Sequence, residues 1–269
     1  MTPLLTRTEA GGRRELRLAL MGTAVVILLL VLSGSFSGRM DALPFTPPGA
    51  AHPFGTDDLG RDLLREVARG VRTSLLLGLG ATSIAMVVGT AVGLAAGMAS
   101  PLADELLMRC TDVVASLPTL IIAILVAALF GGSLPALAMV LGLTRWPLVA
   151  RLVRAETASL RQRDFVLAAK ALGATPTRVV LVHVLPHAAT VALAATGILF
   201  GGALVSEAAL AFVGLGDPSV TSLGQLASNG FAFVSHAPWM WIAPTAATVV
   251  LTVAVAIAAD RPVPGDWPQ

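Results

Sequence analysis

Few side chains in this sequence combine a reactive type with an informative position. Glu207 lies inside a strongly apolar run, shortly before Phe212. A carboxylate in an apolar zone is costly, and it usually faces a protein interior or a water-filled path. Two interpretations of Glu207 therefore stay open: a residue of a pathway or gate, or a buried, hydrogen-bonded acid near the outer interface.

Metal binding has weak support. His183 and His187 have a spacing that can place two imidazoles on one helical face, but Pro186 lies between them and disrupts that helix. Asp57 and Asp58 have no histidine at a spacing that closes a metal site. No nucleophile stands in a motif beside either histidine, so a membrane hydrolase is a weak alternative, and we predict no metal site.

The lysine content excludes nucleotide hydrolysis by this chain. A phosphate-binding loop needs a Gly-Lys-Ser/Thr sequence. The only lysine, Lys170, stands between Ala169 and Ala171. Any energy that the chain uses must therefore come from a partner or from an ion gradient.

The composition is that of a membrane protein. Only 13% of the residues are charged and 55% are hydrophobic, with a mean hydropathy of +0.82, whereas a soluble domain is about 25% charged. A helix that crosses a bilayer needs about 20 mostly apolar residues. Six apolar runs predict an all-α integral membrane protein with six transmembrane helices, at Leu18–Ser33, Leu75–Met98, Val113–Phe130, Leu134–Leu152, Ala188–Phe212 and Trp239–Ala259.

The positive charges indicate the orientation. Arginines concentrate in the N-terminal tail 1–17 and, with Lys170, in the stretch 145–187, whereas the arginines of the stretch 34–74 are balanced by an equal number of Asp and Glu residues. By the positive-inside rule this stretch and both termini are cytoplasmic. The predicted organisation is a tail at 1–17, a transmembrane domain at 18–259 and a tail at 260–269. Alternatively, the first run is a cleaved signal peptide, which leaves five spans and the basic stretch on the same side.

The basic stretch contains a predicted helix–turn–helix. Residues 164–172 read as one helix, with Gly173 well placed as its left-handed C-cap. Thr175 then caps a second helix that begins with Pro176. We expect Pro186 to end this second helix before the next span.

One face of the first of these helices is suited to contact with a partner. Phe165, Ala168, Ala169 and Leu172 share a face by their 3/4 spacing. Small residues with one aromatic side chain fit a shallow groove on another protein. The alternative is an amphipathic helix that lies on lipid headgroups.

Two features of the spans predict helix packing. Gly89, Gly93 and Gly97 form overlapping small-xxx-small units on one face, which allows another helix to approach closely. Packing within the chain is one interpretation and a subunit interface is the other. Arg145 lies in the fourth predicted span beside Trp146, and we interpret it as a structural residue that extends toward the inner interface.

Two polar segments are assigned to the outer side. In the stretch 52–62, a tight turn at Asp57-Asp58-Leu59-Gly60 is expected, with Thr56 or Asp57 as the cap of the helix that enters the second span. The uncharged stretch Ser219–Asn229 could return into the outer membrane face as irregular, protein-lined backbone.

The inner helix–turn–helix resembles the EAA loop of ABC importer permeases. That pattern is Glu-Ala-Ala, three residues, Gly, and a later Leu-Pro. The residues that match it in order and spacing are Ala168, Ala169, Gly173, Leu185 and Pro186. Leu167 stands where the pattern has its glutamate, which is a departure from it.

Other segments are similar to permeases of the dipeptide/oligopeptide/nickel group, and best to the second of their two permease subunits. These segments are residues 52–62, 104–109, 151–154, 206–216 and 222–225. The resemblance covers about Leu18 to Ala259, while the C-terminal tail matches poorly.

The resemblance implies a type I ABC importer permease fold, with a cytoplasmic coupling loop at 155–187. It implies that this loop docks on two ATPase subunits, which bind ATP and Mg, so that the chain itself holds no cofactor and is not an enzyme. The other implied partners are a homologous second permease, an extracytoplasmic solute-binding protein and the lipid of a bacterial inner membrane, with no nucleic acid. The implied coupling residues are Phe165, Leu167, Ala168, Ala169, Leu172, Gly173 and Pro186.

The cargo stays open within this resemblance. Peptides are the first choice, and nickel or another small solute is the alternative. A rival function of another class is a proton-coupled secondary carrier, which needs ionisable residues along the midplane of the membrane. Glu207 alone gives that rival little support.

Overall fold

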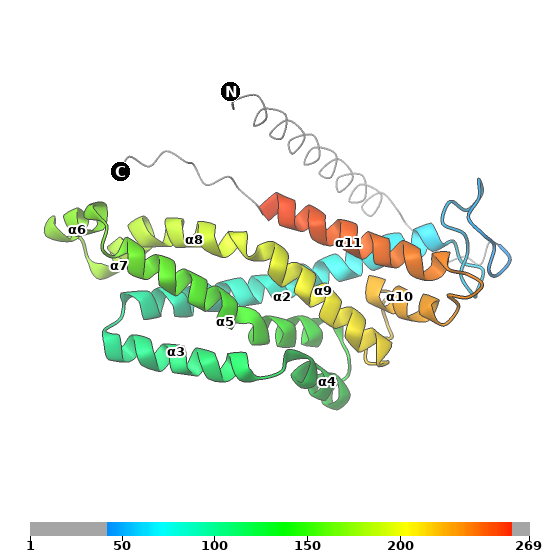
Figure 1. Cartoon of the computed structure of the whole chain (residues 1–269), viewed down its shortest axis with the longest axis horizontal. Helices are drawn as coiled ribbons and strands as arrows, with labels where there is room; N and C mark the ends of the chain where they lie inside the picture. Colours follow the sequence, from blue (N-terminus) through cyan, green and yellow to red (C-terminus); the bar gives the residue numbers. More distant parts are fainter. Residues whose placement is uncertain (1–41, 260–269) are drawn as a thin grey trace, which may run out of the picture. The chain divides into compact units, whose positions relative to one another are not determined.

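The computed structural model describes residues 42–259. The first predicted span, Leu18–Ser33, and both predicted tails lie outside the described residues, as does the signal-peptide alternative. Figure 1 shows the arrangement of the helices along the chain. Within the described part, the regular elements are helices, apart from one isolated β-bridge between Thr56 and Asp62. The helices are α2 (Leu63–Met98), α3 (Pro101–Ser116), α4 (Thr119–Phe130), α5 (Leu134–Leu160), α6 (Asp164–Ala171), α7 (Pro176–Arg178), the π-helix η1 (Val179–Val184), α8 (Leu185–Ala194), α9 (Thr196–Phe212), α10 (Leu223–Phe231) and α11 (Trp239–Ala259).

Four stretches of helix in residues 42–259 are long and apolar enough to cross a membrane, or five if a bent pair counts as one span. They include α2, which begins well before the predicted Leu75, and α5, which continues past the predicted Leu152 to Leu160. Helix α11 has the predicted bounds. The predicted membrane-spanning, all-helical class is confirmed.

The third predicted span is wrong as one straight helix. Helices α3 and α4 meet at a bend of 70°. The bend follows from Pro118, because the residue before a proline is pushed out of the helical region. Leu117 accordingly has an extended backbone, with φ −74° and ψ 128°.

The fifth predicted span, Ala188–Phe212, is wrong at its start. A single helical stretch runs from Pro176 to Ala194 through α7, η1 and α8. It is separated at Ala195 from α9, a shorter apolar helix that carries Glu207.

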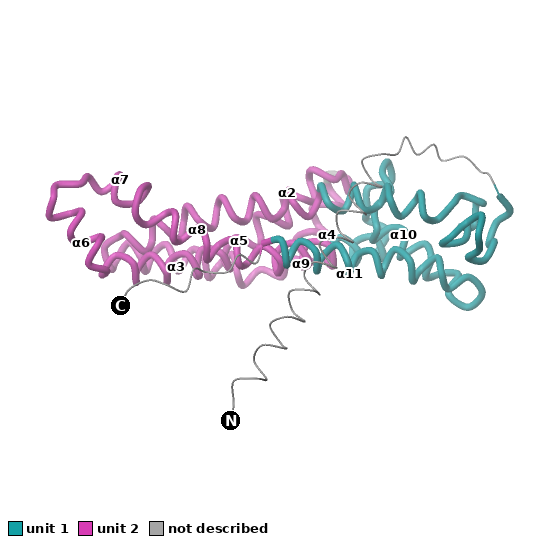
Figure 2. Tube along the Cα trace, turned by 90° about the horizontal axis from the view of Figure 1, so that it is seen from above, with its two compact units in different colours: residues 1–76, 207–258 teal, residues 77–206, 259–269 magenta. Residues whose placement is uncertain are grey.

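The described chain forms two compact units, which Figure 2 colours teal and magenta. The first contains the residues up to Leu76 and Glu207–Ala258, and the second contains Leu77–Ser206. The core of the second unit lies where α2, α5, α8 and α9 pack together. Its buried side chains are Ala85, Val149, Val153, Ala188, Ala192, Ala195 and Leu199.

Three glycines of α2 lie against α5. A Cβ atom on Gly89 would lie 2.5 Å from the Cβ of Val149, and one on Gly93 would lie 2.6 Å from the Ala150 carbonyl oxygen. A Cβ on Gly97 would lie 2.6 Å from the Cβ of Thr157. Such distances are closer than packed atoms tolerate, so α5 approaches α2 to within the space that a side chain would need. This geometry is the packing within the chain that the sequence left as one of two alternatives.

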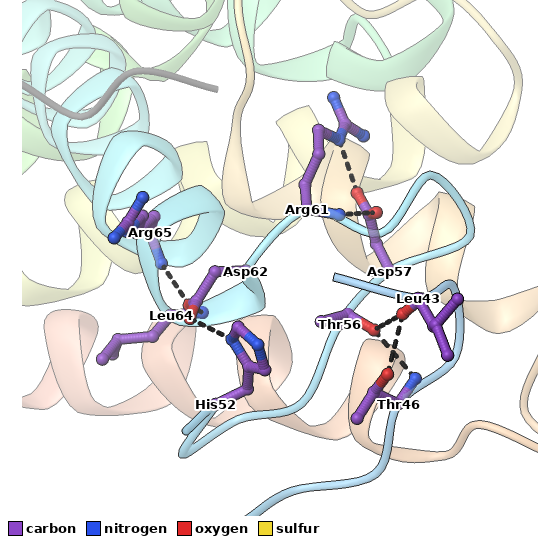
Figure 3. A network of polar contacts seen from close by, with 9 residues as sticks. All are labelled: Leu43, Thr46, His52, Thr56, Asp57, Arg61, Asp62, Leu64 and Arg65. Carbon is purple, nitrogen blue, oxygen red and sulfur yellow. Dashed lines mark hydrogen bonds and ion pairs between the residues drawn. The ribbon is translucent and has the colours of Figure 1, made fainter. Parts of the chain in front are cut away.

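The segment before α2, residues 42–62, is held by carboxylates (Figure 3). Asp57 Oδ1 accepts hydrogen bonds from the amides of Leu59 and Arg61, at 2.9 and 2.8 Å, which closes the predicted tight turn. Neither Thr56 nor Asp57 caps α2, so that prediction is wrong. The cap is Asp62, which stands immediately before the first helical residue and accepts from the amide of Leu64 at 2.9 Å.

The opposite oxygen of Asp62 lies 2.8 Å from His52 Nδ1. One carboxylate therefore joins the preceding loop to the start of α2. Further along, the indole N–H of Trp239 donates to the carbonyl of Thr56 at 3.2 Å, which attaches the same loop to α11. The segment before α2 thus has a defined structure within its own unit.

Candidate functional site

The candidate site is the helical hairpin of α6, α7 and η1, which the sequence singled out. Helix α6 begins after Arg163, whose backbone is extended, and carries Asp164 in its first turn. It ends at Ala171 and is followed, after Leu172, by Gly173, which has φ +82° and no atom within 4 Å of a Cβ placed on it. The amide of Ala174 then donates to the carbonyl of Ala169 at 3.0 Å. The predicted left-handed glycine after the first helix is confirmed.

The second arm of the hairpin begins as predicted. Thr175 is its N-cap, with Oγ1 accepting from the amide of Arg178 at 3.4 Å, and Pro176 is its first residue. Pro186 does not end it, however, and this prediction is wrong. The chain widens into the π-helix η1, where the amide of Leu185 donates to the carbonyl of Val180, five residues back.

This widened turn explains how the helix tolerates the proline. Pro186 lacks an amide hydrogen, and it stands at the second position of α8. An amide in the first turn of a helix has no acceptor within that helix, so a proline there removes no hydrogen bond. A single π-helical turn inside an α-helix is rare and is frequently found at functional sites. The arm from Pro176 is consequently joined to the apolar part of α8 without a break.

Helix α6 is attached to this arm by a small core. Val166 is its one buried residue, and it packs in a cluster with Leu160 at the end of α5 and with Val179 and Val184 of η1. The ring of Phe165 stacks on His187 at a centroid distance of 5.6 Å. The Nδ1 atom of His187 in turn lies 2.9 Å from the carbonyl oxygen of His183.

These contacts give the two histidines a packing role. They lie on one continuous helical stretch, contrary to the expectation that Pro186 would separate them. Among residues 42–259, no group of three or more His, Cys, Asp or Glu side chains is arranged to hold a metal ion.

Two sides of α6 differ in their surroundings. On one side Leu172 is 89% exposed and Phe165 is 42% exposed, with Ala168 exposed and Ala169 half-buried between them. Leu167 belongs to the other side, where it lines a cavity with Lys170. The residue at the position of the pattern's glutamate is therefore separated from the apolar face of α6.

Glu207 lies in α9, and it is 3% exposed. Its carboxylate accepts hydrogen bonds from the hydroxyl of Ser222 and from the amide of Gly224. The amide of Leu223 donates to Ser74 Oγ of α2 at 3.1 Å. Side chains of α9 and α2 thus accept hydrogen bonds from amides in the first turn of α10. These amides have no partner within the helix itself, as in any α-helix.

This arrangement corresponds to the buried, hydrogen-bonded alternative for Glu207. It also corrects the expectation of irregular backbone at Ser219–Asn229, because residues 223–231 form α10. Ser222 is the N-cap of α10, and its Oγ accepts from the amide of Gln225 at 3.1 Å. The signal that could have revealed this helix is the sequence Ser222-Leu-Gly-Gln225, a capping residue followed by Gln at the third helical position.

Arg145 points toward another helix rather than toward the inner interface, so that expectation is wrong. Its Nη2 atom donates to the carbonyl of Gly202 at 2.9 Å and to Ser206 Oγ at 2.8 Å. A Cβ on Gly202 would lie 2.2 Å from Nη1. Arg145 therefore joins α5 to α9, which keeps it in a structural role within the second unit.

Sequence reasoning missed a set of ion pairs between α3 and α5. Arg154 makes a bidentate contact with Asp104, with both N–O distances at 2.6 Å. Arg151 and Asp112 form a second, more exposed pair at 2.8 Å. The opposite charges of the two segments can be read from the sequence. Their pairing, however, depends on the turn between α2 and α3, which brings α3 alongside α5.

The chain matches the family model of the binding-protein-dependent transport system inner membrane component over residues 89–264. The chain belongs to this family. The matched region contains the α6–η1 hairpin, α9 with Glu207, and α10.

Relatives of this inner membrane component include three transport permeases. The Dipeptide transport system permease protein DppC of Alkalihalophilus pseudofirmus is 31% identical over 237 residues, which cover 85% of this chain and 78% of the relative. The Oligopeptide transport system permease protein OppC of Bacillus subtilis is 29% identical, covering 86% and 79%. The Probable D,D-dipeptide transport system permease protein DdpC of Escherichia coli is 32% identical, covering 86% and 81%.

Solved structures show the same fold. A chain of the MetNI methionine ABC transporter, in an inward-facing conformation, superposes with a TM-score of 0.61 at 20% identity, covering 73% of this chain and 94% of the other. A chain of an amino acid ABC transporter gives 0.55 at 20% identity, covering 73% and 92%. The inner membrane component described here therefore has the type I ABC importer permease fold that the resemblance implied.

Proposed function

We propose that this chain is a permease subunit of an ATP-driven importer and forms half of the translocation path for peptides. The observation that carries the proposal is the match to dipeptide and oligopeptide permeases over more than three quarters of their length. Import of nickel or another small solute through the same type of path is the alternative. The match favours peptides because the names of these relatives refer to peptides.

The coupling site of this function is the apolar face of α6, residues Phe165, Ala168, Ala169 and Leu172. Exposed apolar side chains on a helix that protrudes from the bundle suit a groove on a partner. The left-handed Gly173 and the continuous arm through Pro186 connect this face to α8. A displacement of α6 by a partner is therefore transmitted to a membrane-spanning helix. Leu167 lies on the other side of α6, and we assign it an indirect part in coupling.

The chain supplies neither ATP hydrolysis nor a cofactor in this function. Two cytoplasmic ABC ATPase subunits bind ATP and Mg and close on each other, and α6 receives that movement. A homologous second permease completes the path, and an extracytoplasmic solute-binding protein delivers the cargo. This assignment places the chain in a bacterial inner membrane with both termini in the cytoplasm, in agreement with the arginines of the 1–17 and 145–187 stretches.

Glu207 has a second possible part in this function, as a residue of the pathway or gate. Its contacts with Ser222 and Gly224 support a role in fixing α10. Both roles predict a requirement for Glu207, and they differ in whether its charge or its hydrogen bonds matter.

The test of the proposed function is purification of the tagged chain from its native membrane in mild detergent, followed by mass spectrometry of the accompanying proteins. We expect two ATPase polypeptides, or one fused polypeptide, and a second permease. The accompanying solute-binding protein would then be used to identify the cargo by its bound peptide. A chain that is purified alone or as a homodimer, without any ATPase, would contradict the proposal and favour a proton-coupled carrier.

A further inference from the structure

A cavity of about 680 Å³ lies beneath α6, on the side opposite its apolar face. We propose that this cavity binds the phosphate headgroup of an anionic phospholipid of the inner leaflet. It is bounded by the end of α2, the start of α3, the end of α5 and by α6. The lining residues that carry the argument are Ala96, Gly97, Ala99, Arg161, Leu167 and Lys170.

The cavity is located where a headgroup would lie. Helices α2 and α5 are both long enough to span a membrane, and they end at Met98 and Leu160. The cavity lining begins at those ends, at Ala96–Ala99 on α2 and at Ala158–Gln162 on and after α5. Both helices have more residues than the roughly 20 that cross the hydrocarbon, so their last turns, which carry this lining, extend past it into the polar region where lipid headgroups lie.

The charges that line the cavity favour an anion. Arg161 and Lys170 are its two basic side chains, and Asp104 is its one acidic side chain. The carboxylate of Asp104 is compensated by the bidentate contact with Arg154. Two positive charges therefore remain in the lining without an acidic side chain to balance them.

Arg161 is held in position for such a ligand. Its Nη1 atom donates to the carbonyl of Ala99 at 3.0 Å, which fixes the guanidinium between α2 and the end of α5. A guanidinium has five N–H donors, so this single bond leaves further donors for a phosphate. Lys170 adds a point charge from α6.

The remaining lining suits the glycerol end of a lipid rather than a free ion. Ala96, Gly97, Ala99, Ala158 and Leu167 present short or apolar surfaces between the two basic residues. A phospholipid has an anionic group next to an apolar part, so it matches both components of the lining. Basic pockets between membrane helices on the cytoplasmic side are known to bind anionic lipid headgroups.

A lipid in this cavity would support α6 from beneath. Helix α6 buries only Val166 within the protein, and Leu167 and Lys170 face the cavity. A headgroup would join α6, through Lys170, to the ends of α2 and α5. The proposal does not depend on the identity of the ATPase or of the cargo.

Lys170 provides a direct test, because it is the only lysine in the sequence. The full chain, with the subunits that accompany it, is placed in nanodiscs of phosphatidylcholine alone or of phosphatidylcholine with 30% phosphatidylglycerol. The rate of acetylation at Lys170 is then followed on the tryptic peptide that spans residues 164–178. With phosphatidylglycerol we expect acetylation to be slower by about fivefold, the effect of roughly one basic side chain near an anionic surface.

Two variants separate a bound headgroup from a general surface effect. In Arg161→Gln, the protection of Lys170 by phosphatidylglycerol should fall to less than twofold. In the double variant Lys170→Gln with Arg163→Lys, the reporter amine stands immediately before α6, outside the cavity lining and outside the proposed docking face, and its acetylation, followed on the peptide 162–178, should be equal in the two nanodiscs. Equal slowing at positions 170 and 163 would overturn the proposal.

Two further results would also overturn it. Full protection by inorganic phosphate in phosphatidylcholine nanodiscs would indicate a site for a free anion. If Arg161→Gln fails to fold, native mass spectrometry of the unchanged complex decides, and the absence of retained phosphatidylglycerol would contradict a lipid site. Retained phosphatidylglycerol together with the fivefold protection supports it.

Discussion

Two short helices, α10 and α6, show how differently this chain secures elements of similar length. Helix α10 has nine residues, of which Leu223, Gly224, Leu226, Ala227 and Gly230 are buried. Helix α6 has eight residues and buries only Val166. Isolated helices this short are unstable in water, so each depends on its tertiary contacts.

The start of each helix differs as much as its burial. The N-terminal amides of α10 donate hydrogen bonds to Ser222, Glu207 and Ser74. The N-cap of α6, Arg163, makes no side-chain capping bond. Helix α10 is thus a fixed part of its unit, whereas α6 exposes the apolar face that is proposed to dock on a partner. The difference indicates that the candidate site is a helix with weak support from its own chain.

The largest effect should come from filling the space beside α10. In Gly224→Leu, the new Cβ would lie 2.5 Å from Glu207 Oε2 and 2.6 Å from the backbone Cα of Ala208. Because the backbone of α9 cannot yield, we expect a loss of about 3 kcal/mol of stability. The measurement is the midpoint of thermal unfolding, followed by tryptophan fluorescence of the purified complex. A midpoint equal to that of the unchanged chain would show that α10 is not tightly held.

The next largest effect concerns the hydrogen bonds of Glu207. In Glu207→Gln, one carboxylate oxygen is replaced by an N–H₂ group that faces one of the two donors, Ser222 or Gly224. One hydrogen bond to Glu207 is therefore lost, which should cost about 2 kcal/mol of stability. Uptake by reconstituted vesicles and the unfolding midpoint are measured together. We expect uptake to fall more than the amount of assembled complex does.

Ser222→Ala is the control for Glu207→Gln, because it removes the Ser222–Glu207 hydrogen bond, together with the cap on the Gln225 amide, and keeps the charge. If both variants lose uptake and stability to the same degree, Glu207 serves to fix α10. If only Glu207→Gln loses uptake, the charge itself is needed and the pathway or gate role is supported. Full uptake by Glu207→Gln would exclude that role.

A smaller loss is expected from the single buried side chain of α6. Val166→Ala removes two methyl groups from the cluster with Leu160, Val179 and Val184, which should cost about 1.5 kcal/mol. The loss should be confined to the hairpin and is measured as faster amide hydrogen exchange in residues 164–178. Exchange that rises equally in α2 and α5 would mean that α6 is part of the main core.

A substitution on the exposed face of α6 should have the smallest effect on stability. The same substitution should have the clearest effect on ATP-driven uptake. Ala168→Asp places a charge where a partner groove is proposed, and we expect a change of stability within about 0.5 kcal/mol. Uptake driven by ATP should fall by about tenfold or more, because a desolvated, unpaired carboxylate costs more than 1.4 kcal/mol. ATP hydrolysis and uptake are measured in the same vesicles.

Leu167→Asn is the control on the other side of α6, because it introduces a polar side chain without placing a carboxylate in the lining of the basic cavity. Leu167 lies beside Lys170 in that cavity and its part in coupling is indirect, so its replacement should lower the coupling of hydrolysis to uptake clearly less than Ala168→Asp does. Equal uncoupling by both variants would show that the docking face has been assigned to the wrong side of α6.

The sequence predicted local features of the hairpin correctly. Gly173 and Thr175 act through the backbone of their own neighbours, so their positions follow from chain geometry alone. Pro186 was interpreted by the same local rule, and that prediction failed. A π-helical turn, which no local propensity indicates, lets the helix continue through it.

The polar residues within the spans could not be assigned in the same way. From the sequence, two roles were open for Glu207, and Arg145 was expected to extend toward the inner interface. The structure places Ser222 and Gly224 at Glu207, and Gly202 and Ser206 at Arg145. The Gly202 and Ser206 partners lie more than fifty positions from Arg145 in the sequence. Such pairings are set by the packing of helices, which a charge pattern does not specify.

By itself, the sequence determined the membrane class and the helical periodicity, because apolar length and local backbone preferences are properties of contiguous residues. It also indicated the family, because the motifs that carry the resemblance lie in contiguous stretches of the chain. The tertiary structure alone decided which helix lies against Gly89, Gly93 and Gly97, and which side of α6 holds Leu167. Those outcomes depend on contacts between distant segments, where side-chain volume and hydrogen-bond geometry select one packing among many that satisfy the same pattern.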